Sequence, residues 1–184
     1  LSKRLAKDVS VLPLATNLNA FKGGSPQLDL ESDYCFTGHY WNAERDIATH
    51  LKHDEIPFDG KIFGNGWEKV EGLKGIAQGP LSYERMPDVY ASTKIVLDDA
   101  NHVTKPWGSV NSRVFDAIGA GRLVVTNGLM GSEDLFDGKL PSYESPDELT
   151  GVLSHYLNDP TARNQLQLEL LRIVEEKHTY GHRA

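Results

Sequence analysis

The chain has 184 residues, enough for one domain with a sizeable hydrophobic core. Hydrophobic residues make up 39% and charged residues 24%, as in ordinary globular proteins. The formal net charge of −7 argues against a general partner that is nucleic acid or an anionic membrane, because phosphate surfaces attract Lys and Arg. A local basic pocket for one diphosphate stays compatible with that charge. The single cysteine, Cys35, excludes an internal disulfide framework and fits a reducing compartment.

No apolar run approaches the length of a membrane span, and no signal peptide is visible. The chain begins with Leu1 rather than Met, so we expect it to be a piece of a longer protein. We predict a cytoplasmic location, with any peripheral attachment to a membrane made by parts outside this chain.

Apolar runs separated by glycine and proline divide the chain into short elements. Residues 1–33 are predicted to be an interdomain linker, and residues 34–184 a separate domain. The predicted strands are 34–37, 61–63, 76–78, 94–97 and 123–126. The predicted helices are 42–53, 82–92, 110–120 and 132–136, followed by one that begins at Pro146 and one that begins at Asp159-Pro160. Gly121 would end the third helix, and Ser145 would cap the fifth. Pro87 argues against a regular helix over 82–92.

Strands that alternate with helices predict an α/β fold: a Rossmann-like parallel sheet with helices on both faces. In such sheets ligands bind beyond the carboxyl ends of the strands. Glycines follow several predicted strands and would let the backbone approach a ligand closely, although ordinary turn glycines are the alternative. They are Gly38, Gly64, Gly79 and Gly128.

The helix predicted to begin at Val110 follows a polar loop. Its unpaired N–H groups and the positive end of its dipole form an anion site suited to a sugar diphosphate. Side-chain donors could come from Ser109, Asn111 and Ser112, and Arg113 could add charge-assisted bonds to phosphate oxygens. The alternative makes Arg113 a solvated helix residue.

Asp116 lies one helical turn beyond Arg113. Its carboxylate can accept bonds from both ribose hydroxyls of a nucleotide. The alternative is a polar residue paired with Arg113 or Lys105.

Further candidates lie after other strands. Gly38 and His39 could approach the diphosphate from the first loop, and Arg45 could reach it from the following helix. Trp67 could stack on a base or be a buried core residue. We predict a base pocket formed by Gln78, Gly79 and Leu81.

We predict no metal site and no bound cofactor. Asp98 and Asp99 are neighbouring carboxylates without a third ligand, and the seven His residues lack metal-ligand spacing. Hydrolase and P-loop motifs are absent from the sequence.

Two long motifs and several short ones carry a family resemblance. The long ones are residues 79–97, GPLSYERMPDVYASTKIVL, and residues 111–126, NSRVFDAIGAGRLVVT. They resemble the carboxy-terminal, nucleotide-sugar-binding domain of GT-B glycosyltransferases, in the CgeB-like branch (glycosyl transferases group 1). The short motifs, in matching order, are LPLAT (12–16), TGHY (37–40), FGNGW (63–67) and HTYGHR (178–183).

The resemblance implies one half of a GT-B fold that binds a nucleotide-diphosphate sugar such as a UDP-sugar. It implies a metal-independent hexosyltransferase that acts in carbohydrate biosynthesis on a glycan, lipid, protein or small-molecule acceptor. The acceptor site belongs to an amino-terminal domain that this chain lacks, so we expect the fragment alone to be inactive. The position of Asp116 is usually Glu in the family and holds the ribose.

Gly108 stands where many retaining GT-B enzymes carry a second Glu, near the donor sugar. We therefore assign no catalytic base, and retaining and inverting outcomes both stay open. This departure motivates an alternative function, a catalytically degenerate domain that serves as a binding or assembly module. A flavodoxin-like regulator is a third and weaker alternative.

Overall fold

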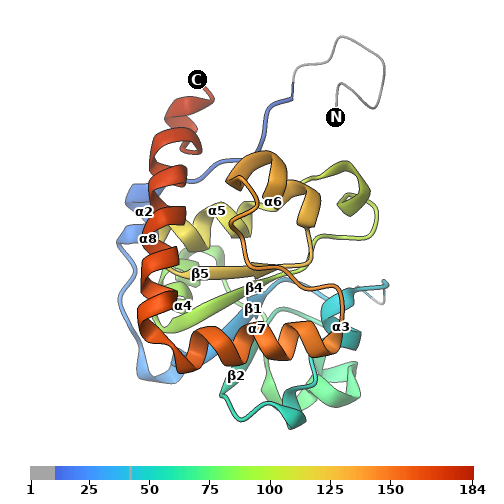
Figure 1. Cartoon of the computed structure of the whole chain (residues 1–184). Coiled ribbons are helices and arrows are strands. Elements are labelled where there is room, and N and C mark those ends of the chain that lie inside the picture. The colour runs from blue at the N-terminus through green and yellow to red at the C-terminus, as the bar shows by residue number, and fades with distance from the viewer. Residues whose placement is uncertain (1–10, 42) are drawn as a thin grey trace.

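A computed structural model describes residues 11–41 and 43–184 and shows five parallel strands with helices around them (Figure 1). This confirms the predicted α/β, Rossmann-like fold class. The strand order is β3-β2-β1-β4-β5. The strands are β1 (Ser32–Thr37), β2 (Gly60–Phe63), β3 (Ala77–Gly79), β4 (Thr93–Asp98) and β5 (Leu123–Thr126).

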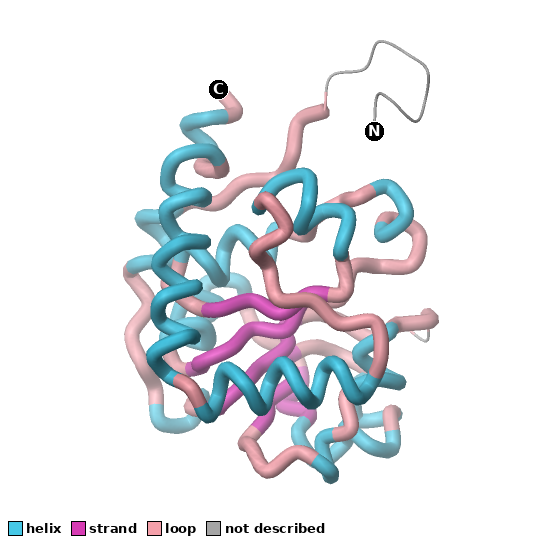
Figure 2. The backbone as a smooth tube through the Cα atoms, in the orientation of Figure 1, coloured by secondary structure: helices cyan, strands magenta, loops and turns pink. Residues whose placement is uncertain are grey.

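Seven α-helices of the described chain surround this sheet, and Figure 2 shows helices on both sides of the strands. Helix α7 crosses in front of the sheet, whereas α4 and α5 lie behind it (Figure 1). The helices are α2 (Leu18–Lys22), α3 (Asp46–His50), α4 (Met86–Ala91), α5 (Ser112–Gly119), α6 (Leu129–Phe136), α7 (Pro146–Asn158) and α8 (Pro160–Lys177). None of the described helices is long and apolar enough to span a bilayer.

The central strands form the hydrophobic core. Residues 95–97 of β4 and 123–125 of β5 are fully buried, because helices cover both faces of a parallel sheet. Such strands read as unbroken apolar runs, and this is why their positions could be predicted to within two residues.

Four helices differ from their predicted bounds. Helix α6 begins at Leu129, three residues before the predicted Ser132. Within 42–53, residue 42 lies outside the described residues and α3 covers only Asp46–His50, because extended Arg45 (φ −140°) precedes it. Within 82–92, a 3-10 turn (Tyr83–Arg85) precedes α4, which holds Pro87 in its first turn, where no N–H is needed. Helix α5 begins at Ser112 rather than Val110, since Asn111 is extended (ψ 152°).

The end of α5 follows the prediction. Gly121 has φ +74° just beyond the helix. Its N–H donates to Ile118 O (2.8 Å), and the next N–H, that of Arg122, donates to Ala117 O (2.9 Å). This pair of bonds is a Schellman motif, which needs the left-handed residue that glycine supplies. The predicted cap of α7 also forms, with Ser145 Oγ accepting from Glu148 N (3.3 Å).

Residues 11–31 pack onto the same core as the strands. Thr16 forms a parallel bridge with Thr179, and Phe21 is buried. Arg183 Nε donates to Pro13 O (2.8 Å), so the two ends of the described chain are tied together. Residues 1–10 of the predicted linker lie outside the described residues, and a domain boundary at residue 34 stays a prediction.

Candidate functional site

The loops after β1, β2 and β3 meet at the carboxyl edge of the sheet. Gly38 N–H donates to Phe63 O (2.8 Å), and Gly64 N–H donates to Gly79 O (2.7 Å). Gly64 has φ +141°, and a Cβ there would lie 2.1 Å from Gly38 O. Glycine at 64 is therefore required by the close approach of the Gly38 backbone, and an approach of Gly64 to a ligand stays a prediction.

Trp67 contacts the loop after β1, which contains Gly38. Its indole Nε1 donates to Gly38 O (2.6 Å), and its ring meets Phe36 edge-on, with 5.3 Å between centroids. The side chain is fully buried. The core interpretation of Trp67 is therefore correct, and stacking on a nucleotide base is excluded.

Asp98, at the end of β4, is a buried carboxylate that joins three elements. Its Oδ1 accepts from Arg113 Nη1 (2.7 Å) and Asn111 Nδ2 (2.8 Å), and its Oδ2 accepts from Thr126 Oγ1 (2.8 Å). Asp98 is only 1% exposed. These bonds attach the start of α5 to the ends of β4 and β5.

Asp99 anchors a second part of the same network. Its carboxylate accepts from Arg45 Nε (2.8 Å) and Asn127 Nδ2 (2.9 Å). Burial raises the pKa of Asp99, although Arg45 opposes the shift. Arg45 thus holds the Asp99 carboxylate, and contact of Arg45 with a phosphate stays a prediction.

The amide of Asn127 also donates to Asp46 Oδ2 (2.7 Å), which Lys105 Nζ contacts at 2.7 Å. Burial opposes ionisation of Asp46, but the bonds from Lys105 and Asn127 hold its pKa below the ordinary value. Within the described residues, no group of three or more His, Cys, Asp or Glu side chains is arranged to hold a metal ion.

Arg113 is held inside the site. Its Nε donates to Thr37 O (2.6 Å), its guanidinium lies 4.5 Å from the Phe36 ring centroid, and its side chain is 14% exposed. The alternative of a solvated helix residue is therefore wrong. Its Nη2 lies directly beneath the first loop, 2.9 Å from where a Cβ on Gly38 would be. Phosphate binding by Arg113 stays a prediction.

The first turn of α5 keeps its N–H groups free of a side-chain cap. Asn111 occupies the capping position, but its amide donates to Asp98 Oδ1 and to Asp99 O (3.3 Å). The side chain of Asn111 therefore orients the helix start, and both of its N–H donors are used within the protein. Ser109 and Ser112 are exposed at the same end of the helix.

Asp116 lies further along α5 and is 5% exposed. Its Oδ1 accepts from Thr16 Oγ1 (2.6 Å). Lys105 pairs with Asp46 instead, so the predicted pairing of Asp116 with Lys105 is wrong. Burial raises the pKa of Asp116 to about 6, against the opposing effects of Thr16 and Arg113.

The predicted base-pocket residues lie on and after β3. Leu81 is half-buried and packs against the core, whereas Gln78 is exposed and donates to Ile76 O (3.1 Å). The carboxylate of Asp116 raises the pKa of Tyr83, after burial of the phenol itself. Asp116 is therefore near the segment that follows Leu81.

His39, in the first loop, has a defined tautomer. Asn65 N–H donates to its Nδ1 (2.9 Å), so the neutral ring carries its proton on Nε2. The ring also stacks on exposed Trp41, with 6.1 Å between centroids. His39 thus keeps its Nε2–H as the donor that the loop does not use.

Prediction from sequence missed several polar residues of this network, among them Thr16, Asp46, Thr126 and Asn127. Thr126 and Asn127 lie at the end of a predicted buried strand, and that position was a usable signal. Thr16 is 100 residues from its partner Asp116, and nothing local in the sequence indicates that pairing.

Replacement of Asp116 with Asn is expected to stabilise the fold above pH 6. The raised pKa means that the folded state holds this proton more tightly than the unfolded state, so its ionisation costs stability as pH rises from about 4 to about 6. Asn keeps an acceptor for Thr16 without the charge. We expect a gain of about 1–3 kcal/mol at pH 8 that disappears near pH 4, measured by urea unfolding. An equal effect at both pH values would contradict the assignment.

Known proteins share both the sequence pattern and the fold of this chain. The chain matches the glycosyl transferase-like family over residues 44–184. Comparison with curated protein sequences finds no significant match. Among solved structures, sucrose-phosphate synthase from Thermosynechococcus elongatus is similar at 13% identity and a TM-score of 0.67, over 98% of this chain and 52% of its own.

Two further structures share the fold. T4 phage BGT in complex with its UDP-glucose substrate has 10% identity and a TM-score of 0.58, over 95% of this chain and 49% of its own. The N-terminal domain of Candida albicans trehalose-6-phosphate phosphatase has 9% identity and a TM-score of 0.60, over 93% and 47%. The chain thus spans about half the length of these structures. Because the family match covers most of the sequence, the chain belongs to the glycosyl transferase-like family.

Proposed function

We propose that the carboxyl edge of the sheet binds the nucleotide diphosphate of a sugar donor, and that the full-length protein transfers the sugar to an acceptor. The observation that carries this proposal is the uncapped start of α5, beside the Arg113 guanidinium and beneath Gly38. Helix N–H groups and a guanidinium are both suited to phosphate oxygens. T4 phage BGT, which has the same fold, has UDP-glucose as its substrate.

The diphosphate would lie over the first turn of α5, where Ser109 and Ser112 add hydroxyl donors. His39 would donate from Nε2, the ring nitrogen that the loop leaves free. These groups, with Arg113, would stabilise the negative charge that builds on the diphosphate as its bond to the sugar breaks. A metal ion performs this task in other transferases. The proposed enzyme is accordingly metal-independent.

Asp116 would hold the ribose. Burial raises the pKa of Asp116, so its ionised form destabilises the fold. Carboxylates with such raised pKa values are concentrated at functional sites, which supports a ligand-binding role. Asp116 is near Tyr83, so the base would lie toward the end of β3 and the residues that follow it, where Gly79 and Leu81 are found. A ribose would take up the acceptor capacity that Thr16 Oγ1 uses only in part.

Titration calorimetry of the chain with UDP, GDP and TDP tests donor binding. We expect one of the three to bind, and Asp116→Asn to weaken that binding by about 1–3 kcal/mol through loss of the charge-assisted ribose contact. Arg172→Gln, an exposed substitution on α8, is the matched control and should leave the affinity unchanged. Binding by none of the three to the folded chain would refute the proposal.

Gly108 favours one alternative, a degenerate module that binds without turnover. Its φ is +68°, a backbone conformation that disfavours any side chain, and a Cβ there would lie 3.2 Å from Met130 Cγ. A glutamate, which many retaining GT-B enzymes carry at this position, would therefore be strained here. The full-length protein, incubated with sugar nucleotides and acceptor extracts, separates the two functions. Sugar transfer supports the enzyme, and nucleotide binding without transfer supports the module.

A further inference from the structure

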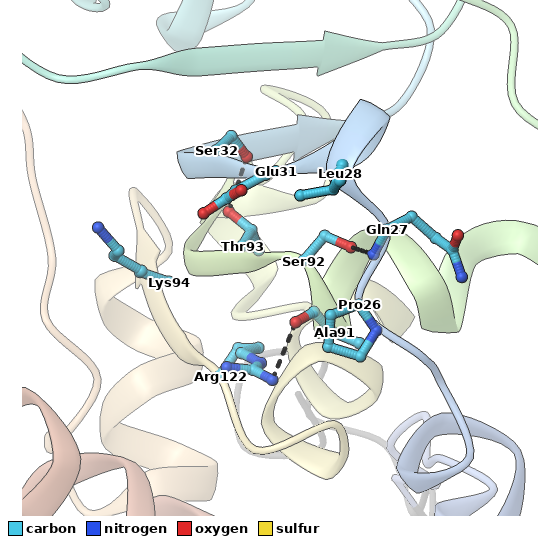
Figure 3. Close-up of a pocket in the computed structure, with 10 residues that line it drawn as sticks. All are labelled: Pro26, Gln27, Leu28, Glu31, Ser32, Ala91, Ser92, Thr93, Lys94 and Arg122. Atoms are coloured by element: carbon cyan, nitrogen blue, oxygen red, sulfur yellow. Dashed lines mark hydrogen bonds between the residues drawn. The ribbon is translucent and has the colours of Figure 1, made fainter.

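A pocket lies at the opposite, amino-terminal edge of the sheet. It has a volume of about 290 Å³ and lies between the segment before β1, the end of α4 and the residue before β5 (Figure 3). Ser32 and Thr93, which line it, are the first residues of β1 and β4. The pocket is therefore separated by the length of the strands from the edge that carries the proposed donor site.

Arg122 is one of the two cationic side chains that line this pocket. Its Nη2 donates to Ala91 O (3.2 Å), the contact drawn in Figure 3. Its Nε is buried and has no partner among the described residues. A guanidinium carries several N–H donors, and a buried donor without an acceptor costs stability. Arg122 therefore has hydrogen-bonding capacity that the described residues leave unused, and the residue lines the pocket.

The charge of Arg122 is also uncompensated. The ion pairs of the described residues do not include it. Burial lowers its pKa, and the positive charge of Arg163 lowers it further. Lys94 adds a second cation to the pocket wall, although Asp33 pairs with it at 2.5 Å, and exposed Glu31 is the acidic group there.

The hydroxyl groups of Ser32 and Ser92, which line the pocket, already donate hydrogen bonds within the protein. Ser92 Oγ donates to Asp88 O (2.7 Å), and Ser32 Oγ donates to Thr93 Oγ1 (3.1 Å). The strongest donors that remain are cationic, and a cation with free N–H groups selects an oxyanion rather than a neutral polar ligand.

We infer that this pocket binds a small metabolite through an oxyanion group, a phosphate or a carboxylate, held by Arg122. The volume limits the ligand to a small one. A guanidinium binds either group in a planar, two-bond geometry. This pocket and the proposed donor site share no residue, so each can be altered by substitution without touching the other.

NMR titration of the full chain tests the pocket with two probes, inorganic phosphate and succinate, each against sodium chloride at equal ionic strength. We expect saturable shifts of the Arg122 Nε–H signal and of the Ser92 and Thr93 amides with at least one probe. The probe that saturates distinguishes phosphate from carboxylate. Absence of saturation with both probes, or equal shifts with chloride, overturns the inference.

Variants locate the effect at Arg122. Arg122→Gln should weaken the binding of the effective probe about tenfold or more, and Arg122→Lys should keep part of it. Arg172→Gln removes the same charge outside the pocket and should change nothing. Unperturbed amide signals at Gly38 and Ser112 verify that each variant is folded. Phosphate binding that survives Arg122→Gln in the folded chain also contradicts the inference, because it places the anion elsewhere.

Discussion

Asp98→Ala should destabilise the fold by about 3–5 kcal/mol, because it removes one partner of a buried ion pair. The substitution leaves Arg113 with a charge, a side chain only 14% exposed and no carboxylate at its Nη1. Asn111 and Thr126 lose an acceptor in the same step. Urea unfolding at pH 7 measures the loss.

The control for Asp98 is Glu71→Ala. Glu71 pairs with Lys74 at 2.6 Å, but the two side chains are 89% and 56% exposed. Solvent screens such a pair, so we expect a loss below about 1 kcal/mol. The double variant Asp98→Ala/Arg113→Met should recover part of the stability lost by Asp98→Ala, since the unpaired charge is gone. Equal costs for Asp98→Ala and Glu71→Ala would show that the buried network contributes no more than an exposed ion pair.

Gly64→Ala is the second change with a large expected effect, a loss of about 2–5 kcal/mol. The added methyl group would meet the Gly38 carbonyl oxygen at 2.1 Å, and the φ of +141° disfavours any side chain. The carbonyl must move, and it is the acceptor of the Trp67 indole. Unfolding curves report the stability, and the Trp67 Nε1–H NMR signal reports the displaced loop.

Gly75→Ala is the matched control for Gly64→Ala. A methyl group on Gly75 would have no atom of the described residues within 4 Å, and the φ of Gly75 lies outside the left-handed region. Alanine should therefore be neutral there, or stabilise by up to about 1 kcal/mol by restricting the unfolded chain. A Gly64→Ala protein as stable as Gly75→Ala, with an unmoved indole signal, would contradict the role given to the close approach of the two loops.

The strands could be predicted from the sequence better than the helices because the two signals differ in kind. Buried parallel strands such as β4 and β5 are apolar runs that neighbouring residues define by themselves. The limits of α3 and α5 depend on tertiary contacts instead. Arg45 is extended where it reaches Asp99, and Asn111 is extended where it reaches Asp98.

The same distinction between local and tertiary signals explains which parts of the candidate site could be predicted. The motif around Arg113 and Asp116 located the edge of the sheet that carries polar groups, because glycines and polar residues follow the strands there. Partner choice could not be predicted, since Arg113 bonds to Thr37 O across 76 residues and Asp116 bonds to Thr16 across 100. Trp67 has one hydrogen-bond donor like any tryptophan, and only its burial decides between a core and a ligand role.

The tie between the two ends of the chain has a consequence for Asp116. Thr16 N–H donates to His178 O (3.1 Å), and Thr16 O accepts from Tyr180 N–H (3.1 Å), so the peptide that carries this hydroxyl is clamped by the carboxyl-terminal segment. A ribose at Asp116 would share this carboxylate with Thr16 Oγ1. The residue that supports the ribose-binding carboxylate is thus itself held in place by the carboxyl-terminal segment, so a truncation after Val174 should weaken donor binding as well as stability.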